Sequence, residues 1–241
     1  SLNKAVNDEF TGIAAQNGQA IQSVVDIAAN TATTVQDYLV NQYEEYDKHG
    51  YNGNTELSSV YTVQLQSMNK QIEEFMINVA TSTVKSTDGI AGVGVFFERG
   101  AFDPGIKDYT IYVSEDDAKN GKVQSFGSYD EYGSKDYYKK AVTTKKDCFT
   151  DPYEDHGIHM VNASYPIVYN DKVQGVIRLD INIDTFSEKM IKTNEQYPSM
   201  YVDILNNDGL VICDSESNDY IGQSLKDLIS EKDYAKIQEG I

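Results

Sequence analysis

Tryptophan is absent from this sequence of 241 residues, and both cysteine and proline are rare. The two cysteines, Cys148 and Cys213, lie far apart along the chain. A disulfide framework needs several cysteines at short, regular spacings, so none is expected. Each cysteine is expected to behave as a small, partly buried hydrophobic residue. The 18 tyrosines and 8 phenylalanines supply ample aromatic surface for a folded core.

Positive charge is also scarce. The chain has 20 lysines and arginines against 38 aspartates and glutamates, which gives a net charge of −18. Arg99 and Arg178 are its only arginines, and its one dense basic run lies at 135–146. Because nucleic acids and anionic membrane surfaces bind basic patches, this excess of negative charge disfavours both. We therefore expect no nucleic-acid partner.

Long hydrophobic runs are missing. No apolar segment approaches the roughly 18 residues that a membrane-spanning helix needs, and no signal peptide opens the chain. Amphipathic helical patterns nevertheless reach both ends of the sequence. One begins at Lys4, and the other continues to Ile241. We interpret the chain as the extracytoplasmic part of a longer membrane protein, whose transmembrane helices would flank this sequence.

Complete catalytic signatures are absent too. Ser82 and Lys85 form a Ser-x-x-Lys pair, but the Ser-Asp-Asn and Lys-Thr-Gly motifs of acyl-transfer enzymes do not follow it. His156 and His159 are candidate ligands for a transition metal, yet such a site needs three or four ligands. The sequence thus predicts no enzyme, no metal site and no cofactor. A surface hydrolase that uses Ser82 or the two histidines is the least favoured alternative.

Two helical patterns open the chain. Apolar residues recur at helical spacing from 4 to 46, which predicts one helix about 60 Å long. Small residues interrupt its heptads, so we favour a stalk along a two-module domain, with dimer contacts along part of it, over a pure coiled coil. Turn-forming residues at 49–54 end this helix. The apolar stripe from Leu57 to Val79 predicts a second helix.

The rest of the chain carries mainly strand patterns, at 90–99, 109–113, 161–168, 173–183, 200–205 and 210–214. Asn170 and Asp171 tolerate positive φ and are expected to form a hairpin turn. A short helix is predicted at 137–142, and the segment Asp-Pro-Tyr-Glu-Asp at 151–155 reads as a turn. Residues 123–129 are expected to lead into a pocket loop. Helices packed on antiparallel sheets make an α+β fold.

The stretch from 135 to 184 contains an ordered set of motifs. A basic residue, a spacer and two aromatic residues come first, then Pro-Tyr-x-Asp, then a strand pair that ends in Gly-Val-x-x-x-Asp-Ile. This order resembles the double Cache family, the extracytoplasmic ligand-sensing domains of bacterial chemoreceptors, sensor histidine kinases and cyclic-dinucleotide enzymes. The segment Ile-Gly-x-x-Leu at 221–225 is similar to a step in the second module of that family.

The resemblance implies a long helical stalk with two PAS-like antiparallel-sheet modules. We assign residues 1–85 to the stalk and second helix, and 86–190 to a membrane-distal ligand-binding module. Residues 191–241 are assigned to a smaller, incomplete membrane-proximal module.

The resemblance also implies a ligand site, with Lys135 in the arginine place, Tyr137 and Tyr138 as the aromatic pair, Tyr153 and Asp155 as the Tyr-x-Asp, and Asp180 as the strand aspartate. The first three would hold a ligand carboxylate and the last three an amine. These residue types also match the needs of a small zwitterion, because charges and aromatic walls must replace its hydration. Lysine lacks the bidentate fork of arginine, so the carboxylate half is altered.

Each of these residues also has a purely structural interpretation. Tyr137 and Tyr138 could pack in the core, and Asp155 could cap a turn. Asp180 lies on an apolar strand and needs a partner. Arg178 lies two residues earlier on the same strand face, and we expect it to pair with Asp180 rather than to serve the ligand.

The predicted function is that of the extracytoplasmic sensor of a chemoreceptor in the cell membrane, which binds a small amino acid or amine. A histidine kinase or diguanylate cyclase sensor is the first alternative. The second is a ligand-free module that only dimerises its receptor through the N-terminal helix.

Overall fold

The computed structural model describes residues 2–190, 198 and 201–239 of the chain. By the density of their internal contacts, these residues form two compact units. The larger unit comprises residues 24–150 and 162–181, and the smaller unit the described parts of 1–23, 151–161 and 182–241.

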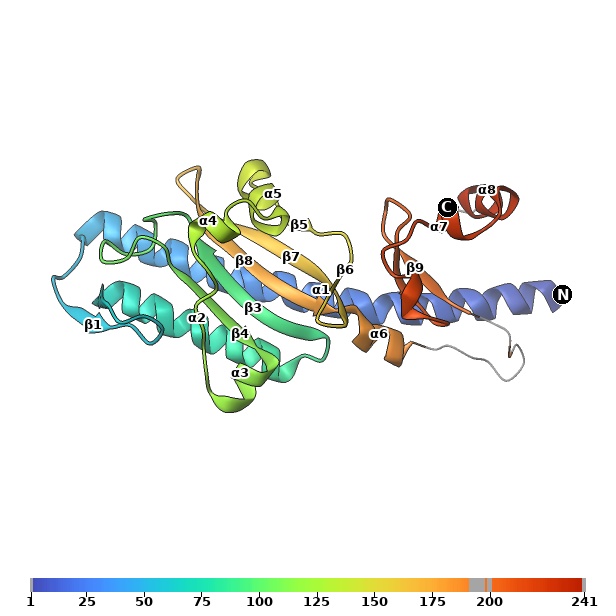
Figure 1. The fold of residues 1–241 in the computed structure, drawn as a ribbon, viewed down its shortest axis with the longest axis horizontal. Helices are drawn as coiled ribbons and strands as arrows, with labels where there is room; N and C mark the ends of the chain where they lie inside the picture. The colour runs from blue at the N-terminus through green and yellow to red at the C-terminus, as the bar shows by residue number, and fades with distance from the viewer. Residues whose placement is uncertain (1, 191–197, 199–200, 240–241) are drawn as a thin grey trace. The chain divides into compact units, whose positions relative to one another are not determined.

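An antiparallel sheet of strand order β4-β3-β8-β7-β5 forms the centre of the larger unit (Figure 1). Its strands are β3 (Ile90–Phe97), β4 (Thr110–Ser114), β5 (Cys148–Phe149), β7 (Ile158–Tyr169) and β8 (Lys172–Asn182). Asn170 and Asp171 turn between β7 and β8 with φ of 47° and 61°, as predicted for a tight hairpin. The predicted α+β class, with its long N-terminal helix and antiparallel sheet, is confirmed.

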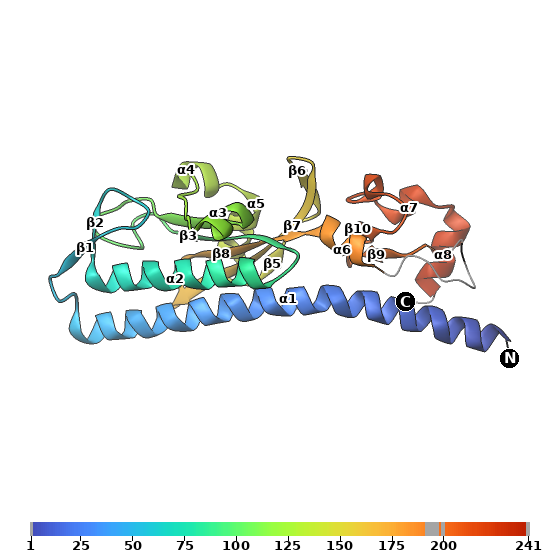
Figure 2. The ribbon, with the colours of Figure 1, turned by 90° about the horizontal axis from the view of Figure 1, so that it is seen from below.

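Two helices cover one face of this sheet, α1 (Leu2–His49) and α2 (Ser67–Ser86), as Figure 2 shows. The ring of Tyr38 on α1 stacks on Phe75 of α2 with centroids 3.8 Å apart. The amide of Gln36 donates to the carbonyl oxygen of Pro166 on β7 at 2.5 Å. Aromatic stacking between the helices and a polar link to the sheet hold α1 in place.

The predicted second helix begins ten residues later than the apolar stripe indicated. Residues 55–57 and 64–66 pair instead as the short strands β1 (Thr55–Leu57) and β2 (Gln64–Gln66). The loop between them is held by Glu73, which accepts hydrogen bonds from Ser58 Oγ at 2.5 Å and Ser59 N at 2.6 Å. Because these donors bond to a carboxylate on α2, residues 58–59 do not form the first turn of a helix.

Two short helices, α4 (Tyr129–Tyr132) and α5 (Asp136–Thr144), lie on the opposite face of the sheet (Figures 1 and 2). A hydrophobic cluster joins them to β3, β5 and β8, and its buried members are Phe96, Tyr132, Tyr138, Ala141, Cys148 and Val176. Helix α3 (Glu115–Asn120) follows β4. The helix predicted at 137–142 is confirmed as α5, and the cluster explains its position.

The smaller unit contains the hairpin of β6 (Tyr153–Asp155) with the start of β7. Segment 151–155 was predicted as a turn, which is wrong for its last three residues. The turn follows directly after this segment, where His156 and Gly157 adopt φ of 51° and 79°. Two consecutive positive φ values match the twist of the flanking strands, so this pair makes the tight turn.

The remaining elements of the smaller unit surround a second hairpin. They are α6 (Ile183–Lys189), β9 (Asp203–Leu205), β10 (Val211–Asp214), the 3₁₀ turn η1 (Asn218–Tyr220), α7 (Leu225–Leu228) and α8 (Glu231–Glu239). Strands β9 and β10 confirm the predicted hairpin, although residue 200 of that prediction lies outside the described residues. Cys213 is buried on β10, and both cysteines are free thiols, as expected.

Asp203 and Asp214 are directly opposed across β9 and β10. Burial, together with the hydrogen bond and the charge of Asp214, raises the pKa of Asp203 to about 7. An unfolded aspartate has a pKa of about 3.9, so folding favours the protonated form of Asp203. The stability that this proton supplies is present below pH 4 and is lost as the pH rises through about 7.

We therefore expect Asp203→Asn to flatten the pH dependence of unfolding between pH 5 and pH 8. The melting temperature of the wild-type protein should fall over this range. Asp203 is only half-buried, so solvent screening limits the fall to a few degrees, at roughly 2–4 °C per kcal/mol for this chain length. Asp208→Asn, in the exposed loop between the two strands, serves as the control. If the melting temperatures of Asp203→Asn and of the wild type changed in parallel with pH, Asp203 would not be the group that causes the pH dependence.

Candidate ligand-binding site

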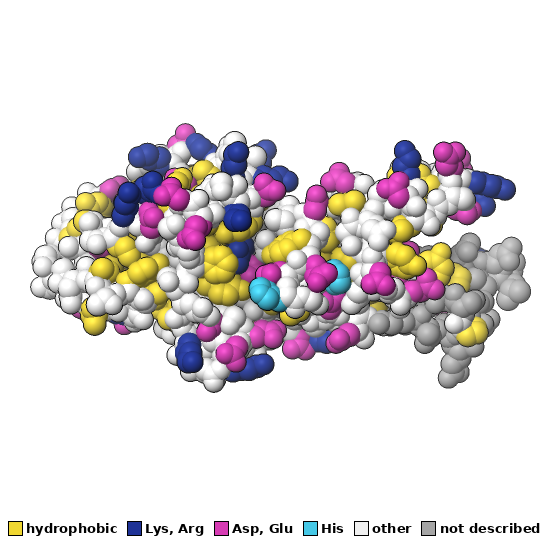
Figure 3. Space-filling model, in the orientation of Figure 1, with side chains coloured by type: hydrophobic (Ala, Val, Ile, Leu, Met, Phe, Trp, Pro, Cys, Tyr) yellow, Lys and Arg dark blue, Asp and Glu magenta, His cyan; other side chains and the backbone are white. Residues whose placement is uncertain are grey.

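A pocket of about 340 Å³ opens beside α4 and α5 in the larger unit. Its wall consists of Ser125, Phe126, Gly127, Glu131, Tyr132, Lys135 and Tyr137. Three of these side chains are aromatic, one is positive and one is negative. The volume lies near the lower end of the range of small-molecule sites, about 300–1,000 Å³. In the space-filling view, basic side chains gather over α4 and α5 (Figure 3).

The guanidinium of Arg178 lies behind this wall, inside a cage of four aromatic rings. Its Cζ atom is 4.4 Å from the ring centroid of Tyr137, 4.8 Å from Phe126, 5.0 Å from Phe96 and 5.5 Å from Tyr112. Ring faces within about 6 Å attract a cation. Two of the four rings, Tyr137 and Phe126, also line the pocket.

Asp180 is the carboxylate that pairs with this guanidinium. Arg178 Nε lies 2.9 Å from Asp180 Oδ1, and Arg178 Nη2 donates to Oδ2 at 3.1 Å. Asn162 Nδ2 donates to Oδ1 at 2.7 Å, and the Tyr112 hydroxyl donates to Oδ2 at 2.8 Å. Both residues of the pair are buried. The expected pairing of Arg178 with Asp180 is confirmed.

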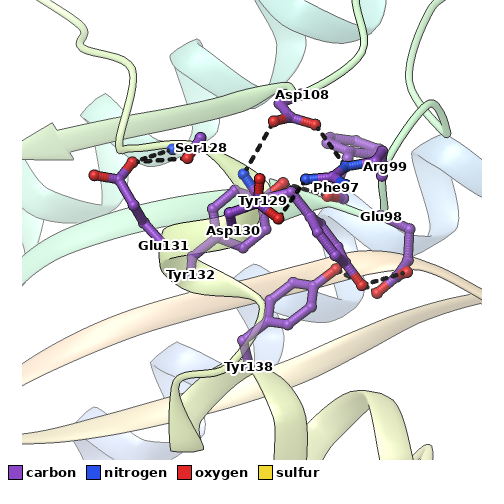
Figure 4. A network of polar contacts seen from close by, with 10 residues as sticks. All are labelled: Phe97, Glu98, Arg99, Asp108, Ser128, Tyr129, Asp130, Glu131, Tyr132 and Tyr138. Carbon is purple, nitrogen blue, oxygen red and sulfur yellow. Dashed lines mark hydrogen bonds and ion pairs between the residues drawn. The ribbon is translucent and has the colours of Figure 1, made fainter.

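Glu98 anchors α4 and α5 to the end of β3, as Figure 4 shows. Its carboxylate accepts hydrogen bonds from the hydroxyls of Tyr138 at 2.6 Å and Tyr129 at 3.1 Å. The Tyr132 hydroxyl donates to the carbonyl oxygen of Phe97 at 2.5 Å. Burial, and then Glu98, raise the pKa of Tyr138 far above its usual value, so its hydroxyl stays protonated and remains a donor.

Arg99 ties the start of α4 to the neighbouring loop. Its Nη2 donates to Asp130 at 2.7 Å, its Nε lies 3.3 Å from Asp108, and its guanidinium lies 4.8 Å from the ring centroid of Tyr129 (Figure 4). Asp108 also accepts a hydrogen bond from the backbone N–H of Tyr129 at 3.2 Å. These contacts hold in place the helices that present the pocket wall.

The six predicted site residues take different places. Lys135 and Tyr137 both line the pocket, whereas Tyr138 points into the core and bonds to Glu98. Asp180 lies behind the aromatic cage. Tyr153 and Asp155 belong to the smaller unit, where both are exposed on β6. Asp155 contacts the His156 ring there at 2.7 Å.

Several residues of this site carry little or no signal in the sequence. Phe126 lies in the segment expected to lead into a pocket loop, but its role in the cage was not foreseen. Phe96 and Tyr112 are strand residues whose aromatic character indicated only burial. Glu131 does not stand out in a chain that is rich in acidic residues. Asn162 is a polar residue within an apolar strand, and this position was the one sign in the sequence that it could have a buried hydrogen-bond partner.

A wider groove of about 860 Å³ lies elsewhere in the larger unit, between α2, α3 and residues 121–124. None of the described residues that line it is aromatic, and its charged members are Glu74, Asp116, Asp117 and Lys122. Its apolar side chains are Ile77 and Val123, and the rest of the wall is mostly polar, so it excludes water poorly. The smaller aromatic pocket is therefore the better candidate for a small organic ligand.

The two histidines of the candidate metal motif are engaged separately. His159 Nδ1 lies 3.0 Å from Asp184, which also accepts a hydrogen bond from Asn218 at 2.8 Å. His156 contacts Asp155. Among the described residues, no group of three potential metal ligands comes together.

Comparison with known proteins identifies residues 76–188 as a match to the family described as methyl-accepting chemotaxis protein-like, first PDC sensor domain. Comparison with functionally curated proteins gave no significant match. In the part of the chain that the structure describes, no helix combines the length and the hydropathy needed to cross a membrane.

Three solved structures illustrate the similarity of fold. The extracellular domain of the putative histidine kinase mmHK1S-Z3 is 19% identical, with a TM-score of 0.64 over 98% of this chain and 80% of that one. The periplasmic sensory domain of the Campylobacter jejuni chemoreceptor Tlp1 is 13% identical, with a TM-score of 0.66 over 100% and 84%. The ligand-binding domain of the Pseudomonas aeruginosa amino acid chemoreceptor PctC, in complex with GABA, is 12% identical, with a TM-score of 0.56 over 92% and 80%.

These findings confirm the predicted resemblance to Cache-type sensors. Residues 76–188 match the family of methyl-accepting chemotaxis protein-like first PDC sensor domains, and the chain has the fold of the extracellular sensor domains of chemoreceptors and histidine kinases.

Proposed function

We propose that this chain is the extracytoplasmic sensor of a methyl-accepting chemotaxis protein and binds a small amino acid or amine in its membrane-distal module. The observation that carries the proposal is the aromatic pocket, in which two of the predicted residues, Lys135 and Tyr137, meet. The family match and the amino acid chemoreceptor among the similar folds support it. The module proposed at 86–190 contains the pocket and its supporting helices.

The pocket offers what a small zwitterion requires. The Lys135 ammonium is a partner for a carboxylate, although a more flexible one than arginine. The rings of Phe126, Tyr132 and Tyr137 provide apolar walls that exclude water and strengthen polar contacts. Glu131 contributes a negative charge to the same wall.

The other predicted residues have different roles in this proposal. Asp180 acts through Arg178 and the cage, and Tyr138 acts through Glu98, which positions α5. The contact of Tyr153 and Asp155 with a ligand stays a prediction, since both belong to the smaller unit.

Signalling would follow from a shift between two arrangements of the sensor. A ligand that binds one arrangement more tightly raises its population, and the long helix α1 carries the change towards the membrane. Attachment through flanking transmembrane helices, and dimer contacts along α1, are part of this proposal. A histidine kinase output is the second candidate, because kinase sensors share the fold.

A thermal-shift screen of amino acids and amines tests the binding function. At a ligand concentration of about 100 times Kd, binding adds about 2.7 kcal/mol of stability, which corresponds to roughly 5–10 °C at 2–4 °C per kcal/mol. Lys135→Ala should abolish the shift produced by a hit that carries a carboxylate.

Lys139→Ala is the matched control, because Lys139 is an exposed lysine on the same helix but outside the pocket wall. It should leave the shift unchanged. A screen in which no compound stabilises the protein would overturn the proposal and favour the ligand-free dimerisation module.

A further inference from the structure

We propose that the guanidinium of Arg178 fills the position beside Asp180 that the ammonium group of a ligand would otherwise occupy. Because this position is filled, the pocket selects ligands by their carboxylate group and rejects simple amines. The inference rests on the proposed ligand-binding function of the pocket and narrows its ligand class to small amino acids and carboxylates. Arg178 would then be a residue that determines specificity.

The cage around Arg178 has the composition of a cation-binding site. A site for an organic cation combines aromatic faces with a carboxylate, because the rings and the anion together replace the water around the charge. The four rings around Arg178 and the carboxylate of Asp180 are such a set. The guanidinium already fills it.

Both oxygens of Asp180 are already engaged by protein groups. Asp180 accepts three hydrogen bonds, from Asn162 on Oδ1 and from Arg178 Nη2 and Tyr112 on Oδ2. The fourth contact is an ion pair, in which Arg178 Nε lies 2.9 Å from Oδ1 without forming a hydrogen bond. A ligand ammonium must therefore displace the guanidinium or one of the other two donors. Displacement of Arg178 leaves a guanidinium buried without its carboxylate, which is costly.

The pocket wall itself carries two charges of opposite sign. Lys135 is its cation and Glu131 its anion. Glu131 Oε2 accepts hydrogen bonds from Ser128 N at 2.6 Å and Ser128 Oγ at 2.9 Å. The backbone bond, followed by the hydroxyl bond, lowers the pKa of Glu131 below its usual value, so this side chain stays ionised.

These charges define the ligand. A carboxylate pairs with Lys135, and an ammonium on the same molecule faces Glu131. Lys135 and Glu131 are both exposed. The difference between them is that the Glu131 carboxylate already accepts two hydrogen bonds from Ser128, so an amine without a carboxylate finds only a partly occupied partner. Simple amines should therefore bind much more weakly than the corresponding amino acids.

Matched triads of ligands test this on the unmodified protein. Each triad holds an amino acid, the amine that lacks its carboxylate and the carboxylate that lacks its amine, such as 4-aminobutyrate, n-butylamine and n-butyrate. Calorimetric titration should show the amine at least about tenfold weaker than both partners in every triad that contains a binder, because only it lacks the group for Lys135. An amine as tight as its amino acid overturns the inference while the binding function stands. If no member of any triad binds, the binding function fails, and the inference fails with it.

Arg178→Gln supplies the second test, because glutamine keeps an N–H donor near Asp180 but removes the cation. In this variant amines should gain at least about tenfold in affinity, since Asp180 and the cage become available to a ligand cation. Lys139→Gln, which removes an exposed cation of α5 outside the pocket wall, is the control and should leave the ligand preference unchanged. A folded R178Q protein that still rejects amines contradicts the proposal. If R178Q does not fold, the triads decide alone.

Discussion

Replacing Glu73 by alanine should destabilise the larger unit by about 3–5 kcal/mol, the cost of breaking a buried ion pair. Glu73 is fully buried and accepts hydrogen bonds from the side chains of Ser58, Lys70 and Tyr109 and from the backbone of Ser59. Lys70 is buried too, and its Nζ lies 3.0 Å from Glu73. Loss of the carboxylate leaves the Lys70 ammonium buried without its closest anionic partner. Urea denaturation followed by circular dichroism measures the loss.

Glu74→Ala is the matched control for this experiment. Glu74 is the next residue on the same helix and lies 3.4 Å from the same lysine, but 58% of its side chain is exposed. Exposed ion pairs contribute at most about 1 kcal/mol. Equal losses in the two variants would show that burial of Glu73 is not what stabilises the unit.

Gly175→Val is expected to cost about 3 kcal/mol, the upper end of the usual cost of overpacking. A Cβ atom at Gly175 would lie 2.4 Å from the carbonyl oxygen of Phe96 and 2.9 Å from the Cα of Phe97. Both neighbours are backbone atoms of β3, so no side-chain rotation can relieve the clash. The strands would separate where Phe96 supports the cage, and ligand binding should weaken along with stability.

Gly18→Ala tests whether glycine replacement in itself is harmful. Gly18 lies within α1, and a Cβ atom built there meets nothing within 4 Å. Alanine at an exposed helical position is more favourable than glycine by about 1 kcal/mol. The chemical denaturation midpoint should therefore rise slightly. A Gly175→Val protein as stable as the wild type would mean that β3 and β8 adapt to the added side chain.

Local patterns predicted most of the helices and strands. The helical spacing of α1, the β-branched residues of β3 and the Asn170-Asp171 turn each express a preference of the backbone or of one amphipathic face. Such preferences act over a few residues, so they are visible in the sequence. The candidate site was different, because Lys135 and Tyr137 were assigned to it by the resemblance to a sensor family and not by a local preference.

Predictions failed where a distant group outweighed the local preference. The stripe from Leu57 reads as helix, yet Ser58 and Ser59 bond to Glu73 on the neighbouring helix and the chain forms a hairpin instead. Similarly, residues 153–155 pair with β7, because His156 and Gly157 accept the positive φ values of a tight turn. Partners far along the chain are not visible in local spacing.

The sequence by itself determined the α+β class and the resemblance to a family of sensor domains. It also indicated an Arg178–Asp180 pair, since two residues two apart on a strand share a face. Only the tertiary structure decided what surrounds that pair. Rings from β3, β4, the loop at residue 126 and α5 converge on the guanidinium, while Asn162 and Tyr112 complete the carboxylate. The physical reason is that a buried charge is stabilised by every group that packs around it, and these groups are neighbours only after folding.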